Sequence, residues 1–164
     1  IVKYFRNGTQ FYATILDYNG NPVASRNVEM NINGVFYTRV TNSEGVVRLN
    51  INLEPDIYIL TLTNPITKEE RSYNITVLSR LVENYDLVKY YKNASRYSVK
   101  VLSDTGSPLS GVNVTFNING VFYNRVTDAE GIAHLNINLQ AGEYIITSAY
   151  NGANIANKVT VKSL

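Results

Sequence analysis

The single histidine, His134, is the first residue to consider as a catalyst or a metal ligand. Zinc sites combine several His, Cys or carboxylate ligands, but this chain has one His and no Cys. It also lacks a nucleophile elbow, a phosphate-binding loop, an HExxH pair and an EF-hand loop. The sequence therefore offers no catalytic residue, metal site or cofactor. It predicts a non-enzymatic protein in which His134 is a solvated strand residue.

Two oxygen-rich stretches are candidates for a calcium site. Asp17–Asn21 begins like a calcium loop, but the equivalent Ser103–Ser107 has fewer carboxylates, and the distal bidentate Glu is missing. A β-turn is the favoured interpretation. Glu83, Asn84 and Asp86 form the second stretch, for which a calcium ion that stiffens the junction is the alternative hypothesis.

The chain has four Asn-x-Ser/Thr sequons, a number that its many Asn residues would also produce by chance. On the expected strand phase, Asn74 and Asn113 face solvent, and Asn7 and Asn93 lie in equivalent early loops. Glycan acceptors must be exposed, so we expect all four to be accessible for glycosylation. An undecorated polar surface is the alternative.

A self-made cross-link between a first-strand lysine and a last-strand asparagine is a further hypothesis. The residues in suitable places are Lys3 or Lys89 with Asn74 or Asn157. Such a bond needs a buried acid as catalyst. The sequence supplies none, since Glu29 corresponds to Thr115 and both should point outward.

The chain is rich in tyrosine, with thirteen residues, and tyrosine rings at a surface can contribute to binding. In Tyr4-Phe5 and Tyr90-Tyr91 one ring must face inward and the next outward, and Phe5 and Tyr91 are taken as candidates for a surface that binds a sugar or a partner. The alternative is that these rings cover a neighbouring strand. Phe36-Tyr37 and Phe122-Tyr123 have the same ambiguity.

An internal repeat organises all of these residues. NINGVFY occurs at Asn31–Tyr37 and again at Asn117–Tyr123, 86 positions later. The same offset aligns LNINL at Leu49–Leu53 with Leu135–Leu139, until a register slip of two residues after Thr61. The chain is therefore two copies of one module.

Alternation with a period of two indicates that each module is made of strands. Val28, Met30 and Ile32 fall on one face of such a strand, which ends at Asn33-Gly34, a strong signal for a type I′ hairpin. About seven short strands separated by turns predict an all-β fold of two tandem immunoglobulin-like β-sandwich domains. The expected domains are residues 1–80 and 87–164, joined by a short, stiff linker at 81–86.

Composition and charge narrow the function classes. Hydrophobic residues make up 45% of the chain, which is typical of a folded domain. The net charge of +2 gives no basic field for nucleic acid, and no apolar run is long enough to span a bilayer. We expect neither nucleic-acid binding nor membrane insertion in this segment, which reads as a piece of a longer array.

Five motifs give the chain a family resemblance. They are KYFRN at Lys3–Asn7 with KYYKN at Lys89–Asn93, the two NINGVFY and two LNINL stretches, and GEYIIT at Gly142–Thr147. These modules resemble bacterial Ig-like repeats of the invasin/intimin type, and most closely the Ig-like repeats of archaeal (methanogen) adhesin-like surface proteins. The first copy departs from this pattern at Asp56, where the second has Gly.

The resemblance implies an extracellular protein of the cell surface or cell wall, in which repeats hold an adhesive region away from the cell. The main hypothesis is therefore a stalk segment whose partners are neighbouring repeats of the same protein, and also cell-wall or partner-cell glycans or proteins. One alternative is a glycan- or wall-binding module that uses exposed aromatic residues. Another is a filament subunit that polymerises by strand exchange.

Overall fold

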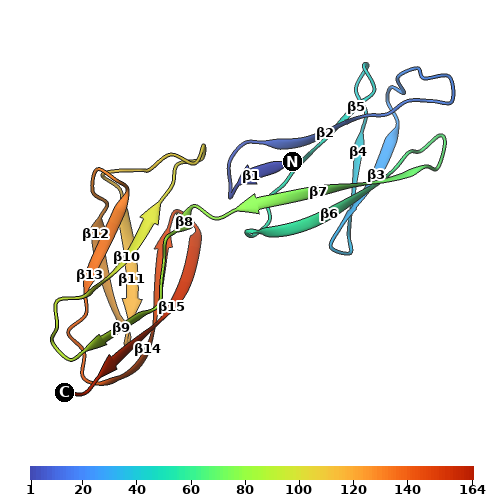
Figure 1. Ribbon diagram of the computed structural model, residues 1–164. Helices are drawn as coiled ribbons and strands as arrows, with labels where there is room; N and C mark the ends of the chain where they lie inside the picture. Colours follow the sequence, from blue (N-terminus) through green and yellow to red (C-terminus); the bar gives the residue numbers. More distant parts are fainter. The chain divides into compact units, whose positions relative to one another are not determined.

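The computed structural model describes residues 1–164 and is built from strands and turns, with no helix (Figure 1). The chain divides into two compact units, unit 1 (Ile1–Leu78) and unit 2 (Ser79–Leu164). Each unit packs two sheets against one another, which confirms the predicted all-β, immunoglobulin-like sandwich fold.

Unit 1 has seven strands in two sheets, with orders β1-β7-β6-β3-β4 and β2-β5. They are β1 (Val2–Tyr4), β2 (Gln10–Thr14), β3 (Asn27–Ile32), β4 (Val35–Val40), β5 (Val46–Asn50), β6 (Asp56–Thr63) and β7 (Glu70–Leu78).

Unit 2 has eight strands in two sheets, with orders β12-β11-β14-β15-β9 and β13-β10-β8. They are β8 (Leu81–Val82), β9 (Leu87–Tyr90), β10 (Arg96–Val101), β11 (Asn113–Ile118), β12 (Val121–Val126), β13 (Ile132–Asn136), β14 (Gly142–Tyr150) and β15 (Ala153–Lys162).

The Asn-Gly hairpins form as predicted. β3 pairs with β4 up to Ile32 and Val35, so the loop between them is the two residues Asn33 and Gly34. Their φ angles are 53° and 79°, and a type I′ turn needs positive φ at both positions. The second NINGVFY stretch makes the same turn between β11 and β12, so the repeated motif has a backbone role in both units.

The core follows the alternation in the sequence. Val28, Met30 and Ile32 of β3 are each at most 2% exposed, and the residues between them face outward. Burying one such side chain stabilises a fold by roughly 1.5–3 kcal/mol relative to leaving it exposed. The equivalent residues of β11 are buried in the same way, so the two units share one core plan.

The first and last strands of the five-stranded sheet run parallel in both units. β1 pairs with the end of β7, and β9 pairs with the end of β15. In unit 2 the chain enters through β8 at one end of the unit and leaves after β15 at the opposite end (Figure 1). A unit of this kind passes the chain from one of its ends to the other.

The smaller sheet differs between the units. In unit 2, β8 adds a third strand by pairing with β10, whereas the corresponding sheet of unit 1 has only β2 and β5. Residues 81–86, expected as a separate linker, thus begin with a strand of unit 2, in which Leu81 is 1% exposed. Leu81 is buried because it packs against β10 and β15. Both strands lie further along the chain, so the sequence around Leu81 does not predict this contact.

Candidate functional site

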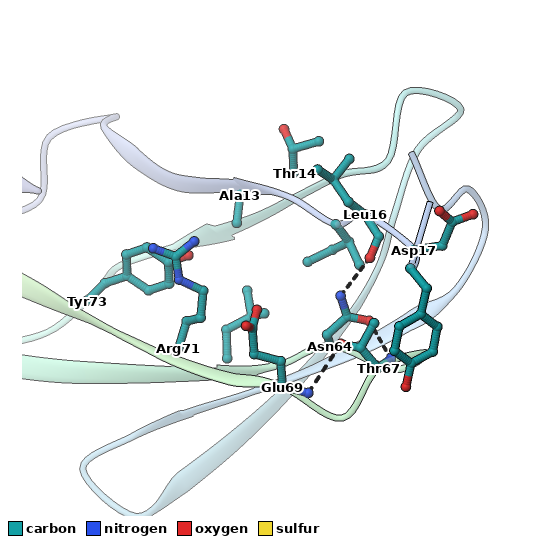
Figure 2. Close-up of a pocket in the computed structure, with 12 residues that line it drawn as sticks. Ala13, Thr14, Leu16, Asp17, Asn64, Thr67, Glu69, Arg71 and Tyr73 are labelled. Carbon is teal, nitrogen blue, oxygen red and sulfur yellow. Dashed lines mark hydrogen bonds between the residues drawn. The ribbon is translucent and has the colours of Figure 1, made fainter. Parts of the chain in front are cut away.

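A groove in unit 1 lies between the free edge of β2 and strand β7. It has a volume of about 480 Å³ and is drawn in Figure 2. We call it the β2–β7 groove. Its lining residues are Ala13, Thr14, Ile15, Leu16, Asp17, Tyr18, Leu62, Asn64, Thr67, Glu69, Arg71 and Tyr73.

The groove combines an apolar floor with a polar rim. Ile15 and Leu62 are buried beneath it, at 3% and 4% exposure. On the rim, the guanidinium carbon of Arg71 lies 5.8 Å from the centre of the Tyr73 ring, within the range of a cation–π contact. The carboxylate of Glu69 adds a negative charge to the same rim (Figure 2). Such a site suits an extended ligand with both apolar and polar groups.

Asn64 organises one end of the groove. Its side-chain amide donates a hydrogen bond of 2.8 Å to the carbonyl oxygen of Leu16, and its Oδ1 accepts from the amides of Ile66 and Thr67. This residue begins the stretch that is longer in the first copy than in the second. The sequence shows this difference in length as a register slip between the two copies, but the slip alone does not predict a groove.

Lys3 and Lys89 are both buried, at 2% exposure each. Lys3 Nζ donates to the carbonyl oxygens of Ile51 and Asn7, and Lys89 Nζ donates to those of Ile137 and Asn93. Burial lowers the pKa of Lys3. These hydrogen bonds to carbonyl oxygens give both buried ammonium groups the partners that burial demands.

The structure does not join these lysines to the asparagines of the cross-link hypothesis. Asn74 is exposed on β7, whereas Lys3 is paired with Val77 and points into the core. Asn157 accepts from the Tyr97 hydroxyl at 2.6 Å and donates to Asn84 and Asp86. No acid forms an ion pair with either lysine. The cross-link therefore has neither its reacting pair nor its acid in place.

Three of the four sequon asparagines are exposed. These are Asn74, Asn93 and Asn113, whereas Asn7 is half-buried, contrary to the prediction that all four are exposed. Asn7 and Asn93 each accept a hydrogen bond from the amide two residues later, which fixes the loop around them. Glycosylation itself stays a prediction.

The aromatic candidates divide between surface and core. Phe5 is 3% exposed, so its prediction as a surface-binding ring is wrong: its side chain belongs to the core of unit 1. Tyr91, its counterpart, is half-buried, with the Lys92 ammonium 5.4 Å from its ring centre. Two rings that do reach solvent are Phe36 and Phe122, at 64% and 67% exposure, which occupy the same position in the two units.

His134 lies within a short polar row in unit 2. Its Nδ1 is 2.6 Å from the hydroxyl oxygen of Ser98, and its Nε2 is 3.7 Å from Asp128. Hydrogen bonds from the amides of Ile132 and Glu130 lower the pKa of Asp128, with the Ile132 bond contributing most. The sequence predicts a solvated strand residue: His134 does lie on a strand, β13, but it is half-buried and pairs with Ser98 of the neighbouring strand.

The stretch Glu83–Asp86 does not gather the oxygens of a calcium site. Asp86 accepts hydrogen bonds from the amide of Lys158 and from the Asn157 side chain, and these bonds lower its pKa. No group of three or more His, Cys, Asp or Glu residues is placed to hold a metal ion. The structure contains no helix with the length and apolarity needed to cross a membrane.

No protein-family model matches this sequence, and no curated protein is similar to it at a significant level. Solved structures that resemble the chain include invasin, a bacterial integrin-binding protein (18% identity, TM-score 0.37), and the fibronectin(III)-like modules of Clostridium thermocellum CbhA (13%, 0.36). The I9–I11 tandem from titin is a third (16%, 0.41).

The matches cover 94%, 98% and 100% of this chain, and 36%, 90% and 63% of the invasin, CbhA and titin chains. This chain thus spans about a third of the invasin structure. Identities and TM-scores this low assign no function to the chain.

Proposed function

We propose that this chain is a non-enzymatic structural segment of an extracellular, adhesin-like surface protein, in which tandem sandwich units provide length. The observation that carries this proposal is the parallel pairing, in both units, of the first and last strands of the five-stranded sheet. Each unit receives the chain at one end of this strand pair and releases it toward the other. Repeating such a unit adds distance, as in other repeat arrays.

The same geometry suits a segment that carries load. In unit 2, β9 and β15 are joined over Leu87–Tyr90, and tension would act on β9 toward its beginning and on β15 toward its end. The two parallel strands are then sheared along their length, so their hydrogen bonds share the force instead of opening one after another. β1 and β7 stand in the same relation in unit 1.

Single-molecule stretching of the full chain between its termini tests the proposal. We expect two discrete unfolding events, each releasing on the order of 250–300 Å of contour, from about 3.6 Å per residue. Smooth extension at low force, with no discrete events, would overturn the load-bearing function.

A matched control assigns one event to unit 2. The chain has no Cys, so a Val88→Cys, Thr160→Cys variant places a cysteine pair at one rung of the β9–β15 ladder. Under oxidising conditions we expect the released length of one event to shrink sharply, and reduction should restore it.

A binding role is the second candidate function, because both units expose an aromatic ring at the same place on an edge strand. Phe36 follows the hairpin of unit 1 and Phe122 that of unit 2, beside the polar residues Asn31 and Asn117 with which they pair. A pull-down on cell-wall or glycan preparations, with a Phe36→Ala, Phe122→Ala variant as control, tests it. Binding that is lost in the variant supports this role, and no binding by the wild type excludes it for those preparations.

Glycosylation and an extracellular location are part of the same proposal. Asn74, Asn93 and Asn113 are the exposed acceptors, and Asn74 lies on the outer face of the larger sheet. The mass of the intact protein from a glycosylating host, compared with that of an Asn74→Gln variant, measures occupancy. A mass equal to that of the bare chain would contradict it.

A further inference from the structure

We propose that the β2–β7 groove of unit 1 is an acceptor site for an extended peptide strand with the chemistry of Ser79–Val82, which would pair antiparallel with the free edge of β2. This inference does not rest on the stalk proposal, because it follows from a comparison between the two units of the same chain. Unit 2 shows such a strand in place, and unit 1 presents the matching edge without one.

In unit 2 the strand is held by both backbone and side chain. Leu81 pairs with Val101, and Val82 pairs with Lys100. The Leu102 amide donates to the carbonyl oxygen of Arg80 at 2.8 Å, which extends the ladder by one more hydrogen bond. The Leu81 side chain is 1% exposed, so it is the apolar anchor of the strand.

The same positions of unit 1 have no such partner. Thr14, Ile15 and Leu16 lie 86 residues before Lys100, Val101 and Leu102, and all three line the groove. The Leu16 amide makes no counterpart of the Leu102–Arg80 hydrogen bond, and the Leu16 side chain is 42% exposed. An exposed edge beside an apolar floor is the arrangement that an added strand completes.

The rim indicates which features of the strand matter. In unit 2 the Leu102 carbonyl oxygen accepts from Arg80 Nε at 3.0 Å, whereas in unit 1 Asn64 already donates to the equivalent oxygen of Leu16. The incoming strand must therefore supply a backbone carbonyl for the Leu16 amide and an aliphatic side chain above Ile15 and Leu62. An arginine before the aliphatic residue is not required.

An extension of the full chain tests the proposal. In unit 2, the eight residues Ser79–Asp86 directly precede Leu87, which corresponds to Ile1. Placing a copy of them before Ile1 should slow hydrogen exchange at the Leu16 amide by at least about tenfold, and should raise the urea midpoint of unit 1. Unit 2, which has its own strand, should be unchanged and serves as the internal reference.

A matched extension that carries the Leu81→Asp change in the added copy is the control, because it keeps the length and the backbone but loses the apolar anchor. We expect little protection of Leu16 from it. Equal protection by both extensions, or by neither, would overturn the proposal.

The source of the strand is tested in trans. A synthetic Ser79–Asp86 peptide, added to the unextended chain, should protect the Leu16 amide in a saturable way. It should do so more weakly than the extension, which has the advantage of high effective concentration. If Leu16 protection instead rises with the concentration of the unextended chain alone, alongside dimer formation, the occupant is a second copy and the proposal is wrong.

Discussion

Replacing Leu81 with alanine tests whether the residues before β9 are part of the core of unit 2. The side chain is 1% exposed between β10 and β15. The change removes three buried carbon atoms, which at about 0.8 kcal/mol each accounts for about 2.4 kcal/mol of lost burial. The remaining cavity adds to this, so we expect unit 2 to be destabilised by roughly 2.5–4 kcal/mol.

Native-state hydrogen exchange can measure this change in each unit separately. A loss of 1.4 kcal/mol lowers the protection of a globally exchanging amide about tenfold, so we expect the amides of Val99 and Val101 to exchange roughly 50- to 1,000-fold faster. Amides of Met30 and Ile32 in unit 1 should not change, because Leu81 belongs to the other unit.

Val126→Ala is the control for this experiment. Val126 is also an aliphatic strand residue of unit 2, but it is 65% exposed, so its loss should cost within about 0.5 kcal/mol. If Leu81→Ala had an effect as small as that of Val126→Ala, the segment would be a linker after all and the reasoning from its burial would be refuted.

Three further predictions concern backbone, hydrogen bonding and pH. Gly131→Ala should destabilise unit 2 more than Gly120→Ala in urea unfolding: both have positive φ, but a Cβ at Gly131 would lie 2.9 Å from two backbone atoms and one at Gly120 meets open space. Tyr97→Phe removes the 2.6 Å hydrogen bond to Asn157 and should lower the free energy of unfolding of unit 2 by about 1 kcal/mol, measured by urea unfolding. An unchanged urea midpoint would show that this hydrogen bond makes no net contribution to stability. Burial lowers the pKa of Lys3, so the unfolded chain keeps this proton to higher pH and the stability of unit 1 should rise as pH increases from the lowered pKa to 10.5. As pH rises through that range, the urea midpoint of the wild type should therefore increase relative to that of Lys3→Met. A difference between the two midpoints that stays constant with pH would contradict the lowered pKa.

The two units solve one packing problem in different ways. In unit 1, Phe11 packs edge-on against Tyr73, with ring centroids 5.0 Å apart. In unit 2, Tyr97 takes the place of Phe11 and hydrogen-bonds to Asn157, which in turn binds the segment at Asn84 and Asp86. Burial raises the pKa of the Tyr97 hydroxyl, the group that donates this hydrogen bond. Unit 2 therefore fixes its entering segment through contacts that unit 1 does not have.

The repeat, the strands and the two Asn-Gly hairpins were all predictable from the sequence alone. These features depend on residues that are near one another along the chain: alternation decides which side chains share a face, and Gly after Asn permits positive φ at the turn. The alternation places Val28, Met30 and Ile32 on one face of their strand, and that face is buried in the structure.

Only the tertiary structure decided which strand edges are covered. Phe5 and Tyr91 occupy equivalent positions in nearly identical motifs, yet one ring is buried and the other is half-buried. Leu81 is buried against strands that follow it in the sequence, and the equivalent edge of unit 1 borders a groove. Burial at such positions depends on which distant segments meet there, and hydrogen bonding across a sheet edge depends on whether a partner strand is present. Local sequence specifies neither of these conditions, because both depend on residues that lie far apart in the chain.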